Sequence, residues 1–137
     1  MTLRAVLISS LYGAIFLSTP VLARQVYVSE NQGKSFAWAY DPENFYTNAE
    51  AVADCGTFAY GGRLWRVPSR QEIETSFPER FLRGRKVYFW TNDCNQSSCQ
   101  AAYVADDQVQ GFVELQKDDP QSEVCITEWD SNTGPDF

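Results

Sequence analysis

Four cysteines constrain the folding of this 137-residue chain more than any other feature of its sequence: Cys55, Cys94, Cys99 and Cys125. Two disulfides can join them in three different pairings, and their number alone does not choose among these. Zinc coordination by all four is not expected, because Cys55 and Cys125 are isolated and such sites use two close pairs. Redox catalysis is not expected either, since the chain has no CxxC motif.

The first 23 residues have the composition of a secretory signal peptide. Arg4 supplies a positive charge, residues 5–17 form a short apolar run, and Val21 and Ala23 place small residues before a cleavage site. We expect cleavage after Ala23, with an uncleaved N-terminal anchor as the alternative. Export to the periplasm or the medium favours two structural disulfides as the state of the cysteines.

Removal of the leader leaves 114 residues, which is enough for one domain over residues 24–130 and a flexible tail over residues 131–137. No stable membrane span is expected after cleavage. Nucleic acid is not expected as a partner, because the exported chain carries a net charge of −8 once Arg4 is removed. The oligomeric state does not follow from the sequence.

The pattern of strand and helix signals predicts an α+β domain. Six runs of β-forming residues predict strands, at residues 25–30, 35–40, 87–91, 100–105, 112–116 and 124–129. A turn is expected over residues 31–33 and a loop over residues 41–44, since both are rich in turn-forming residues.

Two capping boxes predict the helices. Thr47 with Glu50 begins the first helix, which is expected to end near residues 61–62. Three residues at i, i+3, i+7 spacing are expected to face the core from this helix: Val52, Cys55 and Ala59. Ser69 with Glu72 begins a second, short helix that stops before a proline.

Residues 61–73, GGRLWRVPSRQEI, are similar to the W-R-[LV]-P-[ST]-x-x-E-[LI] signature of a bacterial exported domain family. That family includes the C-terminal domains of Lcl-type collagen-like adhesins. Three further matches occur in the family's order, namely Trp38 with the helix at residues 47–55, the FWTN run at residues 89–92, and Cys125 in the closing strand. The resemblance covers residues 36–129.

This family resembles the C-type-lectin fold, in which a disulfide joins the first helix to the last strand. The resemblance therefore implies Cys55–Cys125, which leaves Cys94–Cys99, and the short polar interval between the latter two also favours local closure. Calcium-dependent lectins of this fold carry EPN or QPD and then WND in a long loop between middle strands. Residues 90–93, WTND, do not match WND, and the middle strands are close in sequence, so calcium is not expected.

The candidate binding residues are a cluster of cations and two polar residues after the Trp90 run: Arg80, Arg83, Arg85, Lys86, Asn92 and Asp93. Residues 63–86 hold seven Lys and Arg against three Glu, whereas residues 105–137 hold nine acidic residues against one lysine. A basic patch on an acidic protein suits sulfated or phosphorylated glycans, because guanidinium groups bind oxyanions well. The alternative is a solvated loop that pairs with the acidic half.

These features predict a non-catalytic, adhesin-like binding module for a glycan or a protein at the cell envelope. A second hypothesis is a small periplasmic inhibitor or accessory protein that docks on a basic partner enzyme through its acidic C-terminal half. The absence of histidine excludes a Ser-His-Asp triad, a Cys-His pair and His-ligated zinc. No cofactor is expected because nucleotide-binding loops are missing, and the Asp106-Asp107 and Asp118-Asp119 pairs lack calcium-loop spacing.

The mature protein is expected to begin at Arg24, because Val21 and Ala23 satisfy the small-residue requirement of signal cleavage. Intact-mass measurement of exported protein should give the mass of residues 24–137. A mass that retains residues 1–23 would contradict this expectation.

Overall fold

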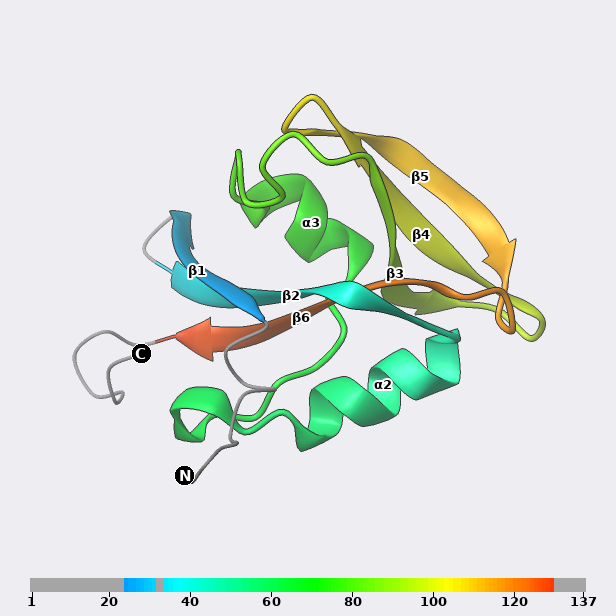
Figure 1. Cartoon of the computed structure of the whole chain (residues 1–137), viewed down its shortest axis with the longest axis horizontal. Coiled ribbons are helices and arrows are strands. Elements are labelled where there is room, and N and C mark those ends of the chain that lie inside the picture. The colour runs from blue at the N-terminus through cyan, green and yellow to red at the C-terminus, as the bar shows by residue number, and fades with distance from the viewer. Residues whose placement is uncertain (1–23, 32–33, 130–137) are drawn as a thin grey trace, which may run out of the picture.

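The computed structural model describes residues 24–31 and 34–129 and shows an α+β domain built on one six-stranded sheet (Figure 1). The elements are β1 (Gln25–Asn31), β2 (Lys34–Tyr46), α2 (Asn48–Thr57), the 3₁₀ turn η2 (Tyr60–Gly62), α3 (Arg70–Ser76), β3 (Val87–Cys94), β4 (Ser98–Ala105), β5 (Gln108–Gln116) and β6 (Gln121–Trp129). The predicted α+β class is confirmed. The predicted leader, the tail at residues 131–137 and positions 32–33 of the predicted first turn lie outside the described residues.

The last strand lies in the middle of the sheet, whose order is β1-β2-β6-β3-β4-β5. β6 pairs antiparallel with β2, with Trp38 opposite Ile126, and it pairs parallel with β3 where Phe89 lies opposite Ser122. The N-terminal hairpin and the β3-β4-β5 meander are therefore joined through β6. The described residues include no helix that is both long and apolar enough to cross a membrane.

Each face of the sheet carries its own core, because alternate residues of a strand point to opposite sides. Trp38 and Phe89 belong to the core that Ile73 of α3 completes, and Trp90 belongs to the core that Cys55 of α2 completes. Figure 1 shows the two helices on opposite sides of the sheet. Trp38, Trp65 and Trp90 are all buried, as the apolar contexts of these residues predict.

Both capping boxes form as predicted. The Thr47 hydroxyl accepts from the Glu50 amide at 3.2 Å, and the Glu50 carboxylate accepts from the Thr47 amide at 2.9 Å. Ser69 and Glu72 make the same reciprocal pair at the start of α3. Each box satisfies amide groups that the first turn of a helix leaves without partners.

The predicted buried stripe of the first helix was wrong. Val52 is 50% exposed and Ala59 lies beyond the helix, which ends at Thr57. The buried residues, Asn48, Ala51 and Cys55, keep the predicted i, i+3, i+7 spacing but begin four positions earlier. The difference arises because Asn48 is buried as a polar residue, its amide donating to the Thr91 carbonyl at 3.2 Å. The glycines near the expected helix end belong instead to η2, where both have positive φ.

Residues 41–44 do not form the separate loop that their composition predicts. They lie within β2, whose pairing with β6 is irregular between Asp41 and Tyr46. The Asp41 carboxylate holds this bulge together by accepting from the Glu43 amide at 3.0 Å, from Asn44 Nδ2 at 3.1 Å and from the Tyr46 hydroxyl at 2.6 Å. The turn-forming residues therefore make a bulge inside a long strand.

Both predicted disulfides are present. Cys55–Cys125 joins α2 to β6 across 70 positions, and Cys94–Cys99 closes the β3–β4 hairpin across 5 positions. Cys55 and Cys125 are fully buried. A bridge that closes a long loop removes more conformational freedom from the unfolded chain than one that closes a short loop.

Removal of the long bridge by Cys55→Ala/Cys125→Ala is expected to lower the free energy of unfolding by about 4 kcal/mol, against about 2 kcal/mol for Cys94→Ala/Cys99→Ala. The two losses should differ because the two bridges close loops of different length. Both cysteine pairs are replaced by alanine, so the substituted residue is the same in the two variants. Urea titration of both variants measures these losses. Equal losses would contradict the expectation.

Candidate functional site

The cations of the predicted binding cluster lie on the connection between α3 and β3, which we call the basic loop (residues 79–86). Phe81 and Leu82 are buried in the core next to α3, so they anchor the middle of this loop. The side chains of the four cations are exposed on either side of this anchor: Arg80, Arg83, Arg85 and Lys86. The alternation of exposed cations and buried apolar residues presents the positive charge to solvent.

The backbone of the basic loop is fixed by hydrogen bonds. The Arg83 amide donates to the Arg80 carbonyl at 3.1 Å, and the Arg85 amide donates to the Leu82 carbonyl at 3.1 Å. The Gly84 amide donates to the Asp107 carboxylate at 2.6 Å, which ties the loop to the β4–β5 turn. Gly84 has a φ of 75°, a value that glycine adopts without steric cost. The cations are therefore carried by an ordered backbone.

The acidic half of the chain does not neutralise the basic loop by ion pairs. Among the described residues, none of the four cations lies within ion-pairing distance of a carboxylate. Arg85 lies with its guanidinium carbon 6.0 Å from the centroid of the Tyr40 ring, at the outer limit of a cation–π contact. Asp107 contacts the loop through the Gly84 amide. The charge of the loop thus remains available to a ligand.

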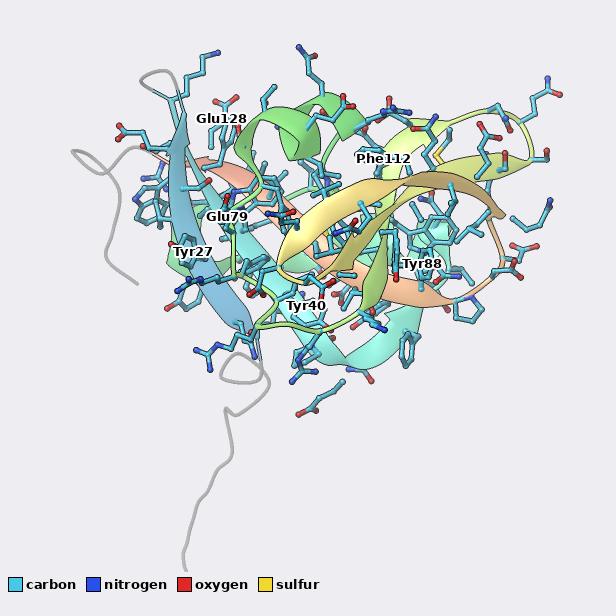
Figure 2. The ribbon with its side chains drawn as sticks, turned by 90° about the horizontal axis from the view of Figure 1, so that it is seen from above. Tyr27, Tyr40, Glu79, Tyr88, Phe112 and Glu128 are labelled. Atoms are coloured by element: carbon cyan, nitrogen blue, oxygen red, sulfur yellow. A yellow bond between two sulfur atoms is a disulfide. The ribbon has the colours of Figure 1, made fainter. Side chains whose placement is uncertain are left out.

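A groove of about 590 Å³ lies beside the basic loop, between α3 and β5. Arg70 and Phe112 line it from the two sides, with the Arg70 guanidinium 4.5 Å from the Phe112 ring centroid. Glu79 of the basic loop also lines this groove and is labelled with Phe112 in Figure 2. Arg70 Nε bonds Glu74 at 3.3 Å, and its Nη1 bonds Gln100 at 3.3 Å, so this arginine is already held by the protein.

Asn92 and Asp93 lie at the opposite end of β3 from the basic loop, about 20 Å from Lys86 at the usual rise of a strand. The Asp93 carboxylate accepts from the Arg70 amide at 2.6 Å, at the start of α3. The Asn92 amide donates to the Pro68 carbonyl at 2.9 Å. The structure therefore does not bring these two residues together with the basic loop, and their observed contacts position α3.

The signature at residues 61–73 also makes structural contacts. Arg66 forms a two-pronged ion pair with Glu72, at 2.7 and 2.5 Å, and exchanges backbone hydrogen bonds with Ile126 of β6. Trp65 is buried, and its indole nitrogen donates to the Tyr60 carbonyl at 2.9 Å. These contacts hold the segment before α3 against the central strand, β6.

The structure contains a buried cluster of charged residues that the sequence did not predict. Glu123 is fully buried at the centre of the sheet, and Arg24 Nη1 donates to its Oε1 at 2.5 Å. Arg24 Nη2 pairs with Asp54 of α2, and the guanidinium carbon lies 4.5 Å from the Phe58 ring centroid. No sequence signal marks this cluster, because Glu123 is one polar residue within an alternating strand and Arg24 is 99 positions away.

Burial and neighbouring groups shift the titration of Glu123. The pKa of Glu123 is raised from 4.5 to about 8, first by burial and then by the neighbouring Asp54, against the lowering effect of Arg24. Glu123 Oε2 has no hydrogen-bond partner, which fits a protonated side chain. Burial raises the pKa of the nearby Tyr46 as well, together with its hydrogen bond to Asp41. Hydrogen bonds lower the pKa of Asp41 although burial acts in the other direction.

One trio of potential metal ligands occurs in the described part of the chain, with ligand atoms of Cys55, Glu123 and Cys125 within 4.8 Å of one another. Both sulfur atoms are consumed by the disulfide. A cysteine binds a metal through its thiolate, and neither cysteine has one while the disulfide is formed. This trio is therefore not a metal site in the oxidised protein.

Comparison of the chain with models of known families, with curated proteins and with solved structures finds no match.

The free energy of unfolding is expected to fall as the pH rises from about 4.5 toward 8, because folded Glu123 keeps a proton that the unfolded chain releases. Glu123→Gln removes this titration, so its stability should depend less on pH over that interval. Urea titrations at several pH values measure the slope, whatever the variant does to absolute stability. The exposed Glu128→Gln in the same strand is the control, and equal slopes for wild type and Glu123→Gln would contradict the expectation.

Proposed function

We propose that this chain is an exported, non-catalytic binding module that holds an anionic group of a surface glycan or protein on its basic loop. The observation that carries the proposal is the display of four exposed cations on a hydrogen-bonded backbone. The whole chain has a net charge of −7, so the loop creates a local field opposite in sign to the rest of the molecule. An anionic ligand would be steered to this loop in preference to other surfaces.

The layout of the domain supports the resemblance to the Lcl-type and C-type-lectin-like domains. Two helices flank the sheet, and the Cys55–Cys125 bridge joins the first described helix to the last strand, as that resemblance implies. The β3–β4 connection is a short turn, in which the Asn95 side chain accepts from the Ser97 and Ser98 amides. This tight connection supports calcium-independent binding, because lectins that use calcium carry ligands in a long loop.

The two disulfides fit a protein of an oxidising compartment. Together with the predicted leader, they support a periplasmic or secreted location. Export also supports an envelope glycan or protein as the partner, and not a nucleic acid.

The second hypothesis, docking on a basic partner through the acidic half, receives less support from the structure. The exposed carboxylates of that half lie on separate parts of the fold, Asp106 at the β4–β5 turn and Asp118 and Asp119 at the opposite end of β5. Glu123 is buried. Within residues 105–129, the acidic residues thus do not form one compact docking surface of the kind that the basic loop offers.

Retention on a heparin column at low salt tests the proposal. Arg83→Ala/Arg85→Ala/Lys86→Ala should abolish retention and leave the melting temperature nearly unchanged, because these side chains are exposed. Retention of the wild type should fall steeply with salt, since exposed charges are screened beyond about 8 Å at physiological ionic strength. The control compares two double variants that each lose two positive charges. Lys34→Ala/Lys117→Ala, which leaves the basic loop intact, should bind heparin more tightly than Arg83→Ala/Lys86→Ala. A wild type that flows through at low salt would overturn the proposal.

A further inference from the structure

Three residues form a row across the outer strands of the sheet. Tyr88 of β3 lies opposite Tyr103 of β4, and Tyr103 lies opposite Gly111 of β5. The two tyrosine rings are stacked, with centroids 4.7 Å apart and planes inclined by 21°. The stack runs along the row, from β3 toward β5, and ends at the glycine.

This row lies on an open part of the sheet. On the same face the main contacts of α2 are with β2, β6 and β3. Tyr88 is 41% exposed, and Val113, the next residue of β5 on this face, is 39% exposed. Figure 2 shows Tyr88 on one side of β5 and Phe112 on the other, toward α3. The stacked rings are therefore separate from the groove beside α3.

Gly111 leaves a gap at the end of the row. A Cβ atom built on Gly111 would meet nothing within 4 Å, so the space above this residue is open. Gly111 lies beside an irregularity in the β4–β5 pairing, since Tyr103 lies opposite Gly111 and Val104 lies opposite Val109, and its φ is not positive. Glycine within a strand often marks a bulge or a place where a ligand approaches closely. The open space above Gly111, beside Tyr103 in the row, is called the slot.

We infer that the slot over Gly111 binds a pyranose ring of an anionic glycan, which continues the Tyr88–Tyr103 stack. Adjacent strands lie about 4.8 Å apart, close to the spacing of stacked rings, so a ring seated over β5 would lie beside Tyr103. The C–H face of a pyranose packs on an aromatic ring while its hydroxyl groups remain in water. This inference rests on the proposed function, since it names the part of the ligand that lies beyond the charged groups.

Charge complementarity favours an anionic sugar over a neutral one. Lys86 is exposed at the end of the basic loop, directly before β3 and two positions before Tyr88. A sulfate or carboxylate bound by Lys86 would place the attached sugar rings near the row. The positive charge of the loop therefore lies close to the first ring of the row.

The experiment compares two anionic probes, a heparin-derived hexasaccharide, which has sugar rings, and a linear polyphosphate, which has none. Gly111→Val should fill the slot and weaken hexasaccharide binding about tenfold while leaving polyphosphate binding unchanged. Its melting temperature should equal or exceed that of the wild type, because valine favours strands and meets open space. Gly56→Val is the matched control, since Gly56 on α2 is equally open and lies away from the row.

The outcomes separate this inference from the proposed function. One contrary result is that the basic-loop substitutions weaken the binding of both probes equally while Gly111→Val changes the binding of neither. That result would overturn the inference that a sugar ring stacks in the slot, and it would leave the basic loop as the binding site. Failure of the wild type to bind either probe would overturn both. A wild-type dimer in sedimentation velocity that Gly111→Val dissociates would assign the slot to a second copy of the chain and overturn the inference.

Discussion

The position of β6 at the centre of the sheet is the constraint on which the rest of the structure depends. Five consecutive residues of this strand each tie it to a distant part of the chain: Glu123 to Arg24, Val124 to the pairing with β2, Cys125 to Cys55, Ile126 to Arg66, and Thr127 to the Leu64 carbonyl. Both cores are completed across this strand. The native contacts of these distant segments therefore depend on the C-terminal strand, β6.

The central strand also determines which parts of the sheet are covered. β6 packs against α2 on one face, and on the other its Val124 and Ile126 lie in the core that Ile73 of α3 completes. Tyr88 of β3 and Val113 of β5, by contrast, are exposed. The basic loop leads directly into β3, which carries the first ring of the Tyr88–Tyr103 stack. A rigid, disulfide-bonded centre thus supports a surface on which charge and aromatic rings are adjacent, which is the chemistry proposed for the ligand.

The buried Arg24–Glu123 contact joins the first described residue of the chain to the last strand. Arg24 is the residue at which the mature chain is expected to begin, and its guanidinium is enclosed by Glu123, Asp54 and the Phe58 ring. The buried Arg24 guanidinium needs these partners, because a buried charge that loses its partners is strongly destabilising. The start of the domain is therefore held against its last strand by a buried polar contact.

The sequence by itself determined the elements and the composition of the site: both capping boxes, the six strand runs, the buried tryptophans and the cluster of cations between Glu79 and Val87. Each of these follows from rules that act within a few residues along the chain. The tertiary structure alone decided the central place of β6, the burial of Glu123 and the row of Tyr88, Tyr103 and Gly111. These depend on strand register and on contacts between distant segments, and neither leaves a periodic trace in the sequence.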